Sequence, residues 1–98
     1  MQINKQMEGT KVTYALEGRL DTTTSPQLEA ELKENLEGVT DLIFDFSQLE
    51  YISSAGLRVM LMAQKMVNAQ GNMIVKNVNE IVMEVFEVTG FDEILTIE

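Results

Sequence analysis

The sequence contains no cysteine, no histidine and no tryptophan. Without cysteine the chain can form no disulfide bond and carries no thiol nucleophile. Without histidine as well, most transition-metal sites and the common nucleophile–base pairs lose their essential groups. Any catalytic chemistry would have to depend on carboxylates and lysines. We therefore expect that the protein is not an enzyme and that it needs no metal or other cofactor.

Basic residues are also scarce, with 7 lysines and arginines against 16 acidic residues and a net charge of −9. Nucleic acids and anionic membrane surfaces both select basic proteins, so neither is an expected partner. No apolar run approaches the roughly 20 residues that a membrane span requires, and the first residues lack the apolar core of a signal peptide. We expect an acidic monomer in the cytoplasm.

The 98 residues, 45% of them hydrophobic, have room for one domain, residues 1–98. Alternating and apolar segments predict strands at 2–7, 12–16, 42–46 and 72–76, the first two joined by a turn at Gly9. The continuous apolar run at 42–46 predicts a central strand with both faces covered. Residues 94–97 predict a terminal edge strand or a short extension.

Amphipathic patterns predict helices at 26–37, 54–69 and 80–88. After the first hairpin, strands and helices alternate, which is typical of parallel crossover units. The predicted fold is therefore an α/β single domain with a mixed, mostly parallel sheet of four to five strands and three or four helices.

The stretch from Asp45 to Arg58 reads Asp-Phe-Ser-Gln-Leu-Glu-Tyr-Ile-Ser-Ser-Ala-Gly-Leu-Arg. It leaves an apolar strand, passes through a short polar turn and enters an apolar helix. Ser53 and Ser54 stand at the start of that helix, with no base, thiol or metal ligand beside them in the sequence. A hydroxyl in such surroundings is better suited to being modified than to catalysing a reaction.

A helical wheel of residues 54–69, drawn at about 100° per residue, separates two faces. The predicted core face consists of Ala55, Val59, Met62, Ala63 and Met66, with Met60 and Val67 at its margin. The predicted outward face carries Ser54, Leu57, Arg58, Leu61, Gln64, Lys65 and Asn68. Two leucines in line with an exposed serine favour a docking patch for a partner protein. The alternative is that they pack beneath a neighbouring loop or the third helix.

Charge is unevenly distributed along the chain. No acidic residue occurs between Tyr51 and Asn79, whereas Arg58, Lys65 and Lys76 fall inside that window. A phosphate on Ser54 would lie at a helix N-terminus, where free N–H groups and the helix dipole favour anions. It need not disrupt the fold, and it would add roughly −1.5 to −2 charges at the rim of the leucine patch.

The stretch around Ser54, together with Gly18-Arg19-Leu20-Asp21 about 30 residues earlier, resembles the two short signatures of the STAS domain of bacterial anti-sigma factor antagonists. The resemblance covers essentially the whole chain and implies a STAS-like fold. It also implies that the unphosphorylated protein binds an anti-sigma factor that is itself a serine kinase, which frees the sigma factor. That kinase then phosphorylates one serine and ends the binding, and a metal-dependent serine phosphatase restores it.

In the family the phosphorylated serine stands two residues before a Gly-Leu pair, which is Ser54 in this chain. Ser53 occupies a position where many members have Asp, and it remains a competing acceptor. Asp21 matches an aspartate that helps to shape the family's site. The expected partner-binding residues are Asp21, Ser53, Ser54, Leu57, Arg58, Leu61 and Lys65.

Other functions remain open at this point. STAS domains also serve as accessory subunits of lipid-transport ABC complexes, and as regulatory tails of anion transporters. A small-molecule binder or enzyme has less support, because the glycines form no phosphate-cradling motif. A catalytic pair of Asp21 and Asp45 is disfavoured, since aromatic residues that could bind a sugar make up only 6% of the chain.

Overall fold

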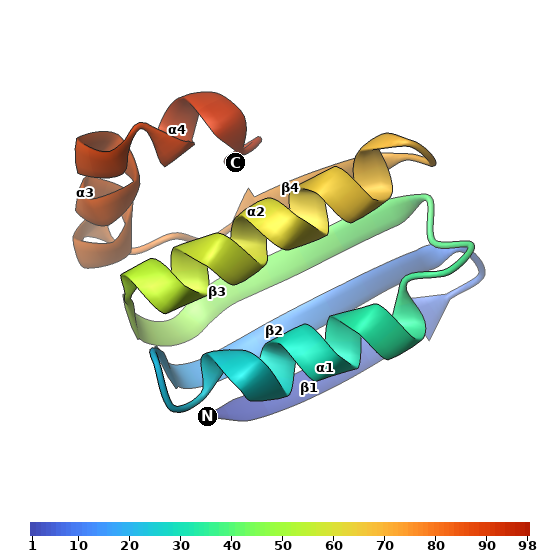
Figure 1. The fold of residues 1–98 in the computed structure, drawn as a ribbon, viewed down its shortest axis with the longest axis horizontal. Helices are drawn as coiled ribbons and strands as arrows, with labels where there is room; N and C mark the ends of the chain where they lie inside the picture. The colour runs from blue at the N-terminus through green and yellow to red at the C-terminus, as the bar shows by residue number, and fades with distance from the viewer.

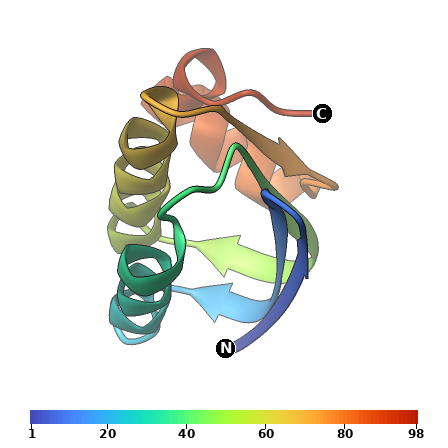
Figure 2. The same cartoon turned by 90° about the vertical axis from the view of Figure 1, so that its right-hand side faces the viewer.

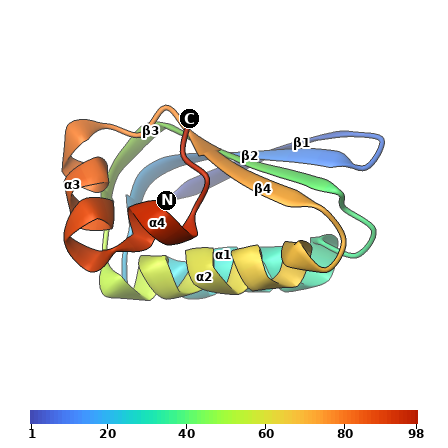
Figure 3. The same ribbon diagram turned by 90° about the horizontal axis from the view of Figure 1, so that it is seen from above.

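A four-stranded sheet with helices against one face organises the chain, and the computed structural model describes all residues 1–98. The elements in chain order are β1 (Gln2–Glu8), β2 (Lys11–Leu20), α1 (Ser25–Asn35), β3 (Asp41–Ile52), α2 (Ser54–Asn68), β4 (Asn72–Lys76), α3 (Glu80–Thr89) and α4 (Phe91–Ile94). Helices α1 and α2 lie next to each other on one face of the sheet (Figures 1 and 2). Helix α3 lies near the end where α2 begins (Figures 1 and 3).

The strands are arranged in the order β1-β2-β3-β4. β1 and β2 pair antiparallel as a hairpin, closed by a two-residue turn in which Gly9 has a φ of 61°. β2, β3 and β4 pair parallel through crossovers that contain α1 and α2. Because both crossovers step in the same direction across the sheet, both helices fall on the same face. The predicted mixed, mostly parallel sheet is confirmed.

The core lies between this sheet and its helices. Residues on one face of β2 and β3 alternate with half-exposed neighbours, and the buried ones include Tyr14, Phe44 and Phe46. The rings of Tyr14 and Phe44 stack with their centroids 6.0 Å apart. On the opposite face no helix covers the sheet, and Ile43 is only half buried. The prediction that residues 42–46 have both faces covered was therefore wrong.

β3 is longer than the sequence pattern indicates. It continues to Ile52, so the residues predicted as a polar turn are strand instead. β2 keeps pace with it to Leu20, with two register shifts near Gly18, whose φ is 102°. Register shifts of this kind bend strands. Because β2 and β3 are parallel and Leu20 pairs with Ile52, their carboxyl ends lie at the same edge of the domain. The serine pair follows directly on the end of β3.

The chain ends in a short helix rather than a strand. Gly90, with a φ of 80°, ends α3 and lets the chain turn into α4. Only Ile97 then returns to the sheet, in an isolated parallel bridge to Val75. Of the two expectations for residues 94–97, the edge strand is wrong and the short extension is confirmed. The reason is that Phe91–Ile94 completes one helical turn before the backbone becomes extended at Leu95.

Candidate functional site

The ends of β2 and β3 bring the two sequence signatures together. Leu20 and Ile52 are paired residues of these parallel strands, and the Ser53 N–H donates to the Leu20 carbonyl oxygen at 2.9 Å. Asp21 and Ser53 therefore follow neighbouring strand ends, at the edge of the sheet where α1 and α2 begin (Figure 1). The two signatures, far apart in the sequence, thus meet at paired strand ends.

The two adjacent serines have different surroundings. Ser54 is the first residue of α2 and is exposed to solvent. Ser53 precedes it as the N-cap, and its carbonyl oxygen accepts the Leu57 N–H at 2.9 Å. The Ser53 hydroxyl is buried and has no hydrogen-bond partner within the protein. Only the Ser54 hydroxyl is open to another protein, which favours Ser54 over Ser53 as a site of modification.

Gly56 explains how α2 can begin so close to the strand ends. A Cβ atom at this position would lie 2.9 Å from the Leu20 carbonyl oxygen and 2.7 Å from Cγ1 of Ile52. Contacts this short are essentially never made by a real Cβ, so any larger residue would push the helix away from the sheet. The glycine of the Ser-Ala-Gly-Leu sequence thus fixes the position of Ser54 without touching its hydroxyl.

Asp21 organises the turn that faces the serines. Its Oδ1 accepts the backbone N–H groups of Thr23 and Thr24 at 3.0 and 3.2 Å, and the Thr23 hydroxyl at 2.8 Å. The hydrogen bond from the Thr23 hydroxyl, with help from the backbone, holds the pKa of this carboxyl below its usual value. Arg19 lies 3.7 Å away and also places its guanidinium 4.4 Å over the Tyr51 ring. Asp21 is an ionised carboxylate that holds a turn.

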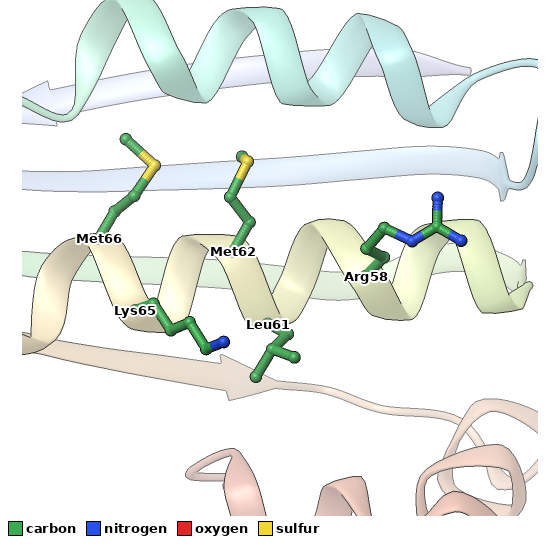
Figure 4. A pocket seen from close by; sticks show the side chains of 5 residues that line it. All are labelled: Arg58, Leu61, Met62, Lys65 and Met66. Atoms are coloured by element: carbon green, nitrogen blue, oxygen red, sulfur yellow. The ribbon is translucent and has the colours of Figure 1, made fainter.

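Helix α2 presents a basic and apolar surface beyond Ser54. Arg58, Leu61, Met62, Lys65 and Met66 line a shallow hollow of ≈440 Å³ (Figure 4). Leu61 and Lys65 point toward β4, whereas Met62 and Met66 point toward α1, so the hollow follows the outer side of the helix. Arg58 and Lys65 are exposed and form no ion pair within the chain. This surface combines apolar contact area with two positive charges that no carboxylate of the chain neutralises.

The helical wheel placed Leu57 of α2 on the wrong face. Leu57, expected on the outward face, is only 5% exposed and belongs to the same buried cluster as Val82 and Phe86 of α3. The alternative that it packs beneath the third helix fits this position, because α3 flanks the start of α2 (Figure 3). Met62 and Met66, expected in the core, are partly buried and pack against it, while their remaining surface lines the outer hollow.

The structure keeps Asp45 away from Asp21. Asp45 pairs with Ala15 in the middle of the sheet, seven residues before Ile52, or about 23 Å along an extended strand. Its Oδ1 accepts from Asn77 at 3.0 Å and from the Ser47 N–H at 2.9 Å, and the Asn77 bond contributes most to lowering its pKa. The two aspartates form no catalytic pair.

No three carboxylates gather to form a metal site. No helix is long and apolar enough to cross a membrane.

Fold and site together define a STAS domain. The family described as "STAS domain" matches residues 2–98, and the chain belongs to it. The BtrV protein of Bordetella bronchiseptica is 40% identical over 78 residues, which are 78% of this chain and 67% of that protein. The anti-sigma-B factor antagonist of Bacillus subtilis is 31% identical over 101 aligned positions, covering 99% of this chain and 92% of that protein.

Among solved structures, an anti-sigma factor antagonist from Mycobacterium paratuberculosis superimposes with a TM-score of 0.88. The match covers 98% of this chain and 83% of that one, at 18% sequence identity. At this identity the agreement concerns the fold, which is the predicted STAS-like architecture.

Proposed function

We propose that this protein is an anti-sigma factor antagonist that works by partner switching. In its unphosphorylated form it binds an anti-sigma factor with serine kinase activity, so that the sigma factor is released. Phosphorylation at Ser54 ends this binding. The observation that carries the proposal is the position of Ser54: an exposed hydroxyl at the start of α2, beside the hollow lined by Arg58, Leu61 and Lys65. The name of the Bacillus subtilis relative, which the chain matches over nearly its full length, supports it.

The chain acts as the substrate of the modification and supplies no catalytic group. The kinase transfers the γ-phosphoryl group of ATP to the Ser54 oxygen, ADP leaves, and a base of the kinase takes the hydroxyl proton. No acidic residue lies in the first turn of α2, so nothing there repels the new phosphate. Free N–H groups at the helix start and the Arg58 side chain one turn later favour the anion.

The switch acts on the partner rather than on the fold. The phosphate adds roughly −1.5 to −2 charges at the rim of a surface that is otherwise basic and apolar. A kinase docked on Leu61 and the two methionines would meet this charge and the added bulk. A metal-dependent serine phosphatase then hydrolyses the phosphate with water and restores the hydroxyl. Because the cycle uses ATP and a sigma factor, we expect it to take place in the cytoplasm. In this proposal the chain acts as a monomer and needs no cofactor, nucleic acid or membrane.

Site mapping tests the proposed acceptor. The purified chain is incubated with its cognate kinase and ATP, and phosphopeptides are sequenced by mass spectrometry. We expect phosphate on Ser54 in the wild type and in Ser53→Ala, and none in Ser54→Ala. Modification of Ser53 in the wild type would overturn the assignment. Recovery of a transporter ATPase and no kinase in a pull-down would instead favour an accessory subunit of a lipid-transport complex.

A further inference from the structure

Helix α3 carries an apolar stripe that the proposed switch does not use. Ile81, Val85 and Val88 recur at i, i+4 and i+7, so they lie on one side of the helix over about 10 Å. Ile81 is 60% and Val88 81% exposed, and together with Glu84 and Thr89 the stripe lines a shallow hollow of ≈270 Å³. Val85, between them, is partly buried against the core. Apolar side chains that gather on one side of a helix, two of them well exposed, favour an interaction surface over scattered surface residues.

The stripe is displayed by a helix that is fixed in place from its other side. Val82 and Phe86 are fully buried in the core. The Asn79 side chain accepts the Val82 N–H at 2.8 Å and donates to the Leu49 carbonyl oxygen of β3 at 2.8 Å. The start of α3 is thereby tied to the strand that leads into Ser54. A partner that docks at the start of α2 has α3 as its neighbour (Figures 1 and 3).

Charge indicates what kind of segment covers the stripe. A second row of side chains at i, i+4 and i+7, formed by Glu80, Glu84 and Glu87, runs along one edge of it. Residues 77–98 contain no lysine or arginine, and their acidic residues are Glu80, Glu84, Glu87, Asp92, Glu93 and Glu98. An anionic membrane would be repelled by this edge, and so would the same edge of a second copy of this chain with its net charge of −9.

We propose that the stripe of Ile81, Val85 and Val88, with its edge of glutamates, docks a basic amphipathic segment of the anti-sigma factor. This inference rests on the proposed function and adds a second surface to it. The partner's apolar side chains pack on Val88 and Ile81, and its lysines or arginines meet Glu84 and Glu87. The α2 surface is basic and changes with phosphorylation, whereas the α3 surface is acidic and constant. The two surfaces of opposite charge fix the orientation of the partner.

Binding of the purified cognate kinase to the full chain, measured by calorimetry, tests this surface. We expect Val88→Glu to weaken binding roughly tenfold or more, because it places a charge within the apolar contact, at the most exposed residue of the stripe. Its matched control is Met7→Glu, which changes a half-exposed apolar residue of β1 to the same side chain. The midpoint temperatures of thermal unfolding of both variants should stay close to that of the wild type, because neither residue is in the core.

A charge-matched pair tests the basic character of the partner segment. The double variant Glu84→Gln/Glu87→Gln should bind more weakly, and its affinity should depend less on salt concentration. The control is the double variant Glu34→Gln/Glu37→Gln on the α1 side, which has the same net charge and should change neither the affinity nor its salt dependence. Equal affinities for the α3 variants and their controls would overturn this inference alone. Absence of binding by the wild type would overturn the proposed function and this inference with it. A wild-type dimer that Val88→Glu converts to a monomer would identify the stripe as a self-association surface and also overturn the inference.

Discussion

A side chain at Gly56 would meet the carbonyl oxygen of Leu20 at 2.9 Å, the same oxygen that accepts the Ser53 N–H at 2.9 Å. The start of α2 is therefore held against the end of β2 both by a hydrogen bond and by the absence of a side chain. Ser54 owes its position to this close contact between a helix and a strand end. The relation makes Gly56 a structural requirement of the site, although it carries no functional group.

Replacement of Gly56 by alanine should destabilise the domain. In an exposed helix, Gly→Ala usually raises stability by about 1 kcal/mol, because alanine is the better helix former. Here the added methyl group would overlap the backbone of Leu20, and we expect the free energy of unfolding to fall by roughly 1–3 kcal/mol. Urea denaturation followed by circular dichroism measures the difference. A midpoint equal to or above that of the wild type would show that the contact between α2 and β2 can relax without cost.

Leu57 and Leu61 should separate into a structural and a binding residue. Leu57 is buried, so Leu57→Ala should lower the free energy of unfolding by about 2–5 kcal/mol. Leu61 lines the outer hollow of α2, and Leu61→Ala should cost much less stability while weakening binding of the kinase. Urea denaturation and calorimetry on both variants provide the comparison. Equal losses of stability would mean that Leu61 too is part of the core.

The sequence predicted the fold and the start of α2 more securely than the outer face of α2. Strand alternation and the spacing of the helices gave the parallel crossovers, and the Ser-Ala-Gly-Leu sequence identified the helix start. The wheel failed for Leu57 because it treats a helix as packed on one flat surface. In the protein α3 lies near the start of α2 (Figure 3), and the sequence does not show which later helix will lie there. Likewise, alternation alone did not reveal that both crossover helices share one face, which leaves Ile43 half exposed.

Tyr14 should make the domain sensitive to alkali. Its hydroxyl donates to Oε2 of Glu31 at 3.1 Å, and burial, followed by the negative charge of Glu31, raises the pKa of Tyr14 well above its usual value. The folded state therefore holds the proton more tightly than the unfolded state. The resulting stabilisation is complete below the unfolded pKa of about 10 and is lost as the pH rises above it toward the folded pKa.

The test is the slope of the unfolding free energy against pH between about 9 and 11.5, where an unfolded tyrosine titrates. We expect Tyr14→Phe to flatten the alkaline fall, because this variant has no proton to lose at that position. If Tyr14→Phe shows the same alkaline slope as the wild type, the coupling of Tyr14 ionisation to folding is absent.

We propose above all that a phosphate on Ser54 controls partner binding while the fold persists. Its most direct test is the dissociation constant of the purified cognate kinase for the chain before and after complete phosphorylation at Ser54. We expect the phosphorylated chain to bind at least about tenfold more weakly, which is a loss of about 1.4 kcal/mol of binding free energy. Its circular dichroism spectrum should be unchanged. Equal affinity of the two forms would contradict the switch.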